Sequence, residues 1–241
     1  MSEAPTTAAG VDGKQANGKA ANGKPTDGWT MLLPPGWARF PTGEGRAREL
    51  DAAIEQVIAR ALPDSMPRDK AEPFRHMLRD ELHQTLGEAR EAGTGAVYLP
   101  TEPMDGVLVP ATIAEVEIVS DAGQDPLRVV TSILSGGYEQ SDPAELDGRP
   151  AVRVVQTKHN VRRGPDWPVV STRQVLYVVS RDEAAGEWLV LSFSTLWNSE
   201  KTELLAEALV LFFDALMTTF RWAGPGASPL NLPERTVPGS A

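Results

Sequence analysis

The chain has 241 residues, a formal net charge of −10 and no cysteine. This length suits one large domain or two small ones, and the missing cysteine excludes disulfides, thiol catalysis and cysteine-based zinc sites. The acidity argues against nucleic acid as a partner, because such proteins neutralise phosphates with a basic face, and it disfavours adsorption to anionic membranes.

The two ends of the chain differ in composition from the middle. Residues 1–27 contain almost no large apolar side chain and repeat the sequence ANGK, so this segment is expected to be a disordered tail. Residues 224–241 are rich in proline and glycine and are expected to form a flexible tail. The prediction is therefore a single α+β domain at 28–223.

The chain begins without the apolar stretch of a secretory signal. Its most apolar run, at 204–217, is interrupted by Glu207 and Asp214 and is shorter than the ~20 residues that cross a bilayer. These features predict a cytoplasmic protein with no membrane insertion.

Apolar periodicity and turn residues divide the first half into strands and helices. The expected elements are a strand at Trp29–Leu33, a helix at Arg48–Leu62, a helix from Pro67 to Gly93, and strands at Ala96–Leu99 and Val107–Val119. Glu115 and Glu117 share one side of the last of these strands, which is expected to be the solvent side of an antiparallel sheet.

The second half is dominated by strands. A short helix is expected after Asp125-Pro126, followed by strands at Ala151–Asn160, Val169–Ser180 and Trp188–Trp197, which form a meander. Ser199 is expected to cap a final helix whose apolar side chains are so numerous that the helix is predicted to be largely buried. Helices, then antiparallel strands, then a covering helix predict an α+β layer sandwich.

Four sequence segments resemble a known family. They are LPPGW at 33–37, LDGRPAVRV at 146–154, EWLVLSFST at 187–195 and FFDALMTTFRW at 212–222. Together they look like actinobacterial proteins of the PsbP-like α/β/α sandwich fold, which includes the photosystem protein PsbP, a Ran-binding nuclear transport factor and LpqN-type mycobacterial lipoproteins. The resemblance implies a binding role for other proteins and not an enzyme. The chain departs from the LpqN-type pattern because it lacks a signal peptide and a lipidated cysteine, and it carries an extended helical pair at 48–92.

The residues that could carry chemistry form no recognisable catalytic or metal motif. His76, Asp80 and His83 share one face of the second helix, but about 10 Å separates the two histidines, so one ion cannot bind both. His159 lies near the end of a strand, and the chain has no recognisable nucleophile motif to accompany it. The sequence therefore predicts no enzyme, no metal and no cofactor.

The loop at 162–168 is the candidate binding site. It combines Arg162, Arg163 and Trp167, and arginine and tryptophan are enriched in protein interfaces. The alternative is that Trp167 folds back over the sheet edge.

Three functions remain open. The first is a protein-interaction or adaptor module whose partner is another protein. The second is a binder of a small apolar ligand between the sheet and the 48–92 helices. The third is an enzyme of unrecognised type. A homodimer is compatible with the acidic composition.

Overall fold

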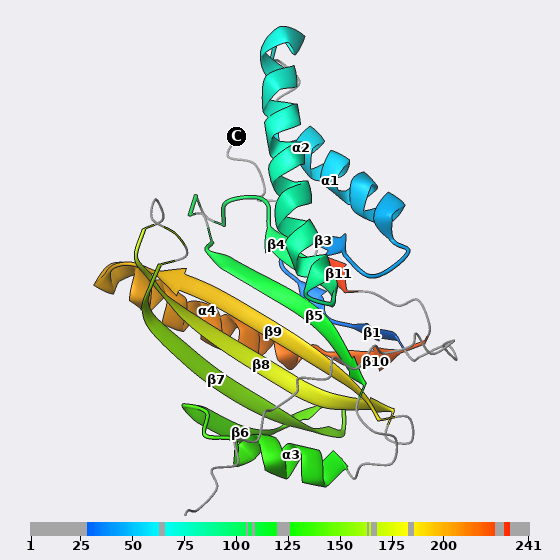
Figure 1. The fold of residues 1–241 in the computed structure, drawn as a ribbon, viewed down its shortest axis with the longest axis vertical. Coiled ribbons are helices and arrows are strands. Elements are labelled where there is room, and N and C mark those ends of the chain that lie inside the picture. Colours follow the sequence, from blue (N-terminus) through cyan, green and yellow to red (C-terminus); the bar gives the residue numbers. More distant parts are fainter. Residues whose placement is uncertain are drawn as a thin grey trace, which may run out of the picture.

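The computed structural model describes residues 28–62, 66–104, 106–107, 109–119, 126–162, 164, 168–182, 186–224 and 229–231. Its centre is a seven-stranded antiparallel sheet in the order β3-β4-β5-β9-β8-β7-β6. The strands are β3 (Trp37–Pro41), β4 (Thr94–Pro100), β5 (Ala111–Val119), β6 (Gln140–Leu146), β7 (Arg149–Val161), β8 (Val170–Asp182) and β9 (Glu187–Trp197). The helices are α1 (Ala47–Ala61), α2 (Arg68–Glu91), α3 (Pro126–Leu134) and α4 (Glu200–Met217), arranged around the sheet as Figure 1 shows. The expected α+β class, an antiparallel sheet flanked by helices, is confirmed.

Consecutive hairpins build the long strands at the centre. β7, β8 and β9 pair in sequence order, which confirms the expected meander. Tight turns with positive φ connect the strands, at Asp147 and Gly148 before β7 and at Gly186 before β9. Trp188 and Trp197 lie on opposite faces of β9 and both are buried, Trp188 in a core with Val130 and Trp197 against His159 and Arg173.

The helix α4 covers one face of the sheet and lies behind it in Figure 1. Ser199 begins the helix with a capping box that it forms with Thr202. The helix buries six residues, Ala206, Leu209, Val210, Phe213, Leu216 and Met217. The prediction that α4 is largely buried was wrong in one respect, since Leu204 and Leu211 remain 65% and 70% exposed. A sheet contacts only one side of a helix, and these leucines point away from it.

The opposite face is covered by helices at its two ends. α1 and α2 pack over β3 and β4, where Phe40, Ile54, Ile58 and Leu86 form a second core. At the other end, α3 packs on β6 and β7. There Val130 of α3 and Trp188 of β9 belong to a third buried core. In Figure 1, α2 projects well beyond the sheet edge.

Several strands were not expected from the sequence, and the expected strand at Trp29–Leu33 is divided into two short strands. β3 and β6 form the two edges of the main sheet, and each contains a proline, which suits an edge position. Two small ladders lie beside the main sheet. β1 (Gly28–Thr30) pairs with β10 (Arg221–Ala223), and β2 (Leu32–Leu33) pairs with β11 (Leu230–Asn231). The last pair places two residues of the segment 224–241 against the start of the domain.

Candidate functional site

An apolar cavity of about 330 Å³ lies between α1, α2 and the β3–β4 edge of the sheet. Helical spacing explains how the two helices line it, because Val57, Ile58 and Ala61 share one face of α1 and Leu78 and Leu82 share one face of α2. The full lining is Phe40, Val57, Ile58, Ala61, Leu78, Glu81, Leu82, Thr85, Leu99, Pro100 and Thr101. The cavity therefore lies where the sequence predicted a ligand site, between the sheet and the 48–92 helices.

Few polar groups reach this cavity. Thr101 already donates its hydroxyl to the Gly36 carbonyl at 2.9 Å, so Glu81 and Thr85 are the groups on α2 that offer polar contacts to a ligand. A mostly apolar wall with a few polar groups at its edge is typical of small-molecule sites.

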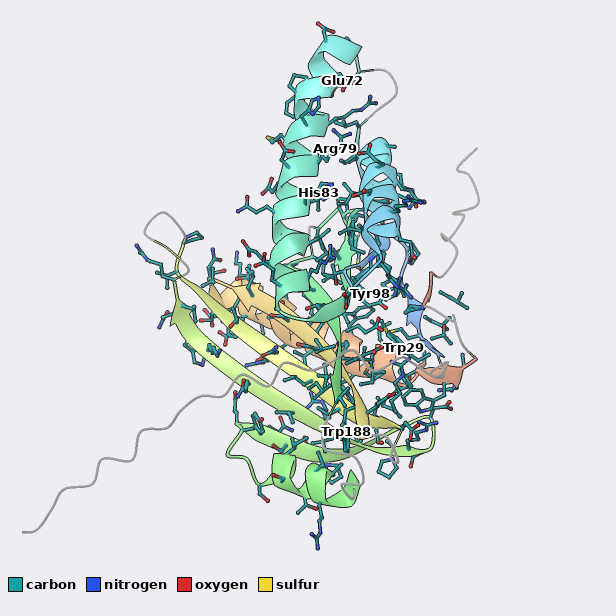
Figure 2. All side chains as sticks on the ribbon, turned by 45° about the vertical axis from the view of Figure 1, so that its right-hand side comes forward. Trp29, Glu72, Arg79, His83, Tyr98 and Trp188 are labelled. Atoms are coloured by element: carbon teal, nitrogen blue, oxygen red, sulfur yellow. The ribbon has the colours of Figure 1, made fainter. Side chains whose placement is uncertain are left out.

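Ion pairs on the surface connect α1 and α2 beside the cavity. Arg79 on α2 donates two hydrogen bonds to the Glu55 carboxylate on α1, at 2.6 and 3.0 Å. These bonds from Arg79 lower the pKa of Glu55 below its ordinary value. His83 Nε2 lies 3.6 Å from Asp51 Oδ1 one turn further along, and Figure 2 shows Arg79 and His83 on α2.

The histidine face of α2 is exposed, and its side chains contact separate partners. His76 Nδ1 lies 3.4 Å from Arg79 Nη1, while His83 faces Asp51, so the structure does not join His76, Asp80 and His83 into one site. Within the described residues, no group of three or more histidine or acidic side chains is placed to hold a metal ion.

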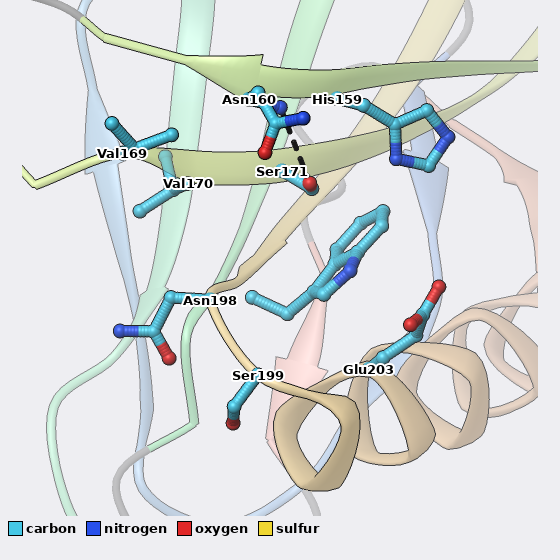
Figure 3. A pocket seen from close by; sticks show the side chains of 9 residues that line it. His159, Asn160, Val169, Val170, Ser171, Asn198, Ser199 and Glu203 are labelled. Carbon is cyan, nitrogen blue, oxygen red and sulfur yellow. Dashed lines mark hydrogen bonds between the residues drawn. The ribbon is translucent and has the colours of Figure 1, made fainter.

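A second cavity, also of about 330 Å³, lies at the end of the sheet where β7, β8 and β9 meet the start of α4. Figure 3 shows its lining, which is mainly polar and includes His159, Ser171, Ser199 and Glu203. The His159 ring packs edge-on against Trp197, with 6.0 Å between the ring centroids.

The serines of this cavity already have structural partners. Ser199 caps α4 and Ser171 Oγ accepts a hydrogen bond from the Asn160 amide at 3.4 Å. The site therefore presents a histidine packed on a tryptophan, and not a nucleophile held by a base.

Of the three residues predicted for the loop site, the structure describes Arg162. Arg162 is exposed and follows β7 directly, two residues after Asn160 of the cavity lining. Arg163 and Trp167 lie outside the described residues. The role of all three residues stays a prediction.

Buried polar networks are the feature that the sequence did not reveal. Glu115 is only 9% exposed, so its expected place on the solvent side of the sheet was wrong. Its carboxylate accepts hydrogen bonds from the Tyr98 hydroxyl at 2.9 Å and from Trp29 Nε1 at 3.4 Å, and Arg39 Nη2 lies 4.0 Å away. Figure 2 labels Tyr98 and Trp29. Burial first, and then the neighbouring Glu115 charge, raise the pKa of Tyr98 well above its ordinary value.

A similar network connects α4 to the sheet. Arg153 on β7 donates two hydrogen bonds to the Asp214 carboxylate, at 2.8 and 2.9 Å, and the Tyr177 hydroxyl donates a third at 2.9 Å. Burial and the Asp214 charge raise the pKa of Tyr177. Both networks satisfy buried charges, as stable packing requires, and neither borders one of the cavities described above.

Comparisons with known proteins add little to these observations. No protein-family model matches the chain, and no curated protein matches it. Among solved structures, the chain is similar to LpqN, described as involved in cell envelope biogenesis of Mycobacterium tuberculosis, with 14% sequence identity and a TM-score of 0.38. The match covers 84% of this chain and 87% of that one.

At this TM-score the likeness transfers neither a site nor a function. The predicted PsbP-like family and actinobacterial source stay predictions. No helix of the described residues is long and apolar enough to span a bilayer.

Proposed function

We propose that the protein is a non-enzymatic binding protein whose ligand is a small apolar molecule held between α1, α2 and the β3–β4 edge. The observation that carries this proposal is the cavity of about 330 Å³ there. Its volume falls at the lower end of the ~300–1,000 Å³ typical of ligand sites.

The lining limits the chemistry of the ligand. Phe40, Leu82 and Leu99 favour a hydrocarbon chain or a ring system. Glu81 is the charged residue of the lining, so it disfavours a carboxylate or phosphate on the ligand and favours a neutral or cationic polar end. The proposal is therefore a neutral or basic amphiphile.

Fluorescence titration with Nile red, a neutral apolar dye, tests the site. Ala61 lines the cavity, and Ala61→Trp fills part of it, so this variant is expected to lose most of the dye binding. Ala59 is exposed on the same helix but outside the cavity, which makes Ala59→Trp the matched control. If Ala61→Trp remains folded and binds the dye as well as the control does, the cavity is not the binding site.

Native mass spectrometry of the protein from its own host addresses the natural ligand. A mass a few hundred daltons above the 26.0 kDa of the chain, lost in Ala61→Trp and kept in Ala59→Trp, supports the proposal. The released compound is expected to be apolar and without an acidic group.

A second candidate is a protein-interaction module that contacts its partner through Arg162, Arg163 and Trp167. The exposed position of Arg162 directly after β7 favours it. A stoichiometric partner that is captured by the wild-type chain and lost with Arg163→Ala plus Trp167→Ala would support this candidate. Arg60→Ala, at an exposed position of α1, is the control. Under both candidates the protein acts in the cytoplasm, without nucleic acid and without insertion in a membrane.

A further inference from the structure

The outward face of α4 carries an apolar stripe that packs against no other element among the described residues. Four exposed residues form it, Leu204, Ala208, Leu211 and Ala215, at steps of four, three and four. Leu204 and Leu211 are 65% and 70% exposed, which is unusual for leucines two turns apart on one helix. Steps of three and four are the spacing by which one helix packs along another.

We propose that this stripe is the interface of a homodimer in which α4 of one copy packs antiparallel against α4 of a second copy. A two-fold axis between Leu204 and Ala215 places each leucine opposite an alanine of the second copy. Leu204 faces Ala215, and Leu211 faces Ala208. Large side chains thus meet small ones along the whole stripe, so the same surface is complementary to itself.

Charges at the two ends of α4 favour the antiparallel direction. The first turn is acidic, with exposed Glu200 and half-buried Glu203. At the other end, Arg221 donates to the Thr218 carbonyl at 3.0 Å and lies 3.8 Å from Asp147, with its side chain 58% exposed. Antiparallel packing brings Glu200 of one copy toward the Arg221–Asp147 pair of the other, whereas parallel packing would place the Glu200 carboxylates of the two copies side by side.

The acidic residues beside the stripe are neutralised within each copy. Glu207 Oε1 lies 4.0 Å from Arg173, and Asp214 receives both hydrogen bonds of Arg153. Close approach of a second α4 therefore does not bring unbalanced carboxylates together along the middle of the helix.

The size of the surface predicts a weak dimer. The 18 residues of α4 span about 27 Å. A single helix pair of that length lies near the lower end of the ~1,200–2,000 Å² buried in specific interfaces. We therefore expect a concentration-dependent equilibrium in the micromolar range. The stripe lies on the sheet face opposite to the α1–α2 cavity, so the dimer does not depend on the proposed ligand function.

Sedimentation velocity over a range of concentrations tests the dimer. The wild-type chain is expected to approach twice its 26.0 kDa mass, and Leu204→Glu with Leu211→Glu is expected to weaken association at least about tenfold. Phe74→Glu with Met77→Glu, two exposed apolar residues of α2, is the matched control and is expected to dimerise as the wild type does. A wild-type monomer at every concentration, or a dimer that persists in the α4 variant, overturns the proposal.

The absence of native cysteine allows a direct test of the direction. Leu204→Cys and Ala215→Cys are made as separate variants and oxidised alone or mixed, one of them carrying a tag that changes its mass. The antiparallel dimer predicts a covalent heterodimer in the mixture and little product from either variant alone. Efficient cross-linking of Leu204→Cys to itself would indicate parallel helices and overturn the arrangement.

Discussion

Removal of the Glu115 carboxylate is expected to destabilise the fold strongly, although a surface glutamate could be replaced at almost no cost. The carboxylate accepts hydrogen bonds from Tyr98 and Trp29 and lies beside Arg39. Glu115→Ala leaves two buried donors without an acceptor, at about 1–3 kcal/mol each. It also removes the anionic neighbour of Arg39, whose side chain is 26% exposed and thus partly hydrated. We expect a loss of about 3–5 kcal/mol in the free energy of unfolding, a large part of the ~5–15 kcal/mol typical of a domain.

Urea unfolding followed by tryptophan fluorescence measures this loss. A change of this size is expected to lower the midpoint by at least about 1 M. Glu115→Gln retains one acceptor oxygen and is expected to cost about half as much. Glu145 is exposed on the edge strand β6, so Glu145→Gln is the control and should change the free energy by less than about 0.5 kcal/mol. A Glu115→Ala protein as stable as the control would refute the reasoning, because it would mean that the carboxylate is hydrated.

Three further changes follow from the same structure. Asp214→Asn weakens the contact of α4 with Arg153 and Tyr177 and is expected to cost about 2–3 kcal/mol in urea unfolding, since the Asp214 side chain is 28% exposed. Ser199→Ala removes the capping box of α4 and is expected to cost about 1 kcal/mol, whereas Ser135→Ala, at an exposed position directly after α3, should cost less. The raised pKa values of Tyr98 and Tyr177 predict alkaline destabilisation, because the unfolded chain releases these protons near pH 10 while the folded chain keeps them. Their contribution is complete below pH 10 and falls by about 1.4 kcal/mol per pH unit for each tyrosine above it. A Tyr98→Phe Tyr177→Phe protein should lose this slope, and an unchanged slope would contradict the assignment.

The sequence predicted the order of the long elements because their apolar periodicity is a local property. α1, α2 and α4 and the strands β7, β8 and β9 lie close to the expected ranges. The edge strands β3 and β6 were missed. They contain proline and charged side chains, and an edge strand needs a partner on one side only, so its sequence pattern is weak.

The two errors at particular residues share one cause. Alternation along β5 places Glu115 on one face of the strand, but it does not say which face α4 covers. Likewise, α4 is apolar on nearly all sides, and its composition does not say which side meets the sheet. Because the helix was predicted to be largely buried, Leu204 and Leu211 were expected to be buried with it.

The candidate site was predicted in part. The sequence indicated a space between the sheet and the 48–92 helices, and the structure has a cavity there that is lined by Phe40 of β3 and by Leu78 and Leu82 of α2. The loop residues Arg163 and Trp167 lie outside the described part of the chain, so their role depends on the partner experiment alone.

By itself, the sequence determined the α+β class, the meander and the caps and turns between elements, because these depend on interactions between residues near each other along the chain. The tertiary structure alone decided which face of each element is buried, and therefore whether Glu115 is a buried acceptor and Leu211 a surface residue. The physical reason is that burial depends on contacts between segments far apart in sequence. Glu115 meets Trp29 across 86 residues, and no local pattern encodes that distance.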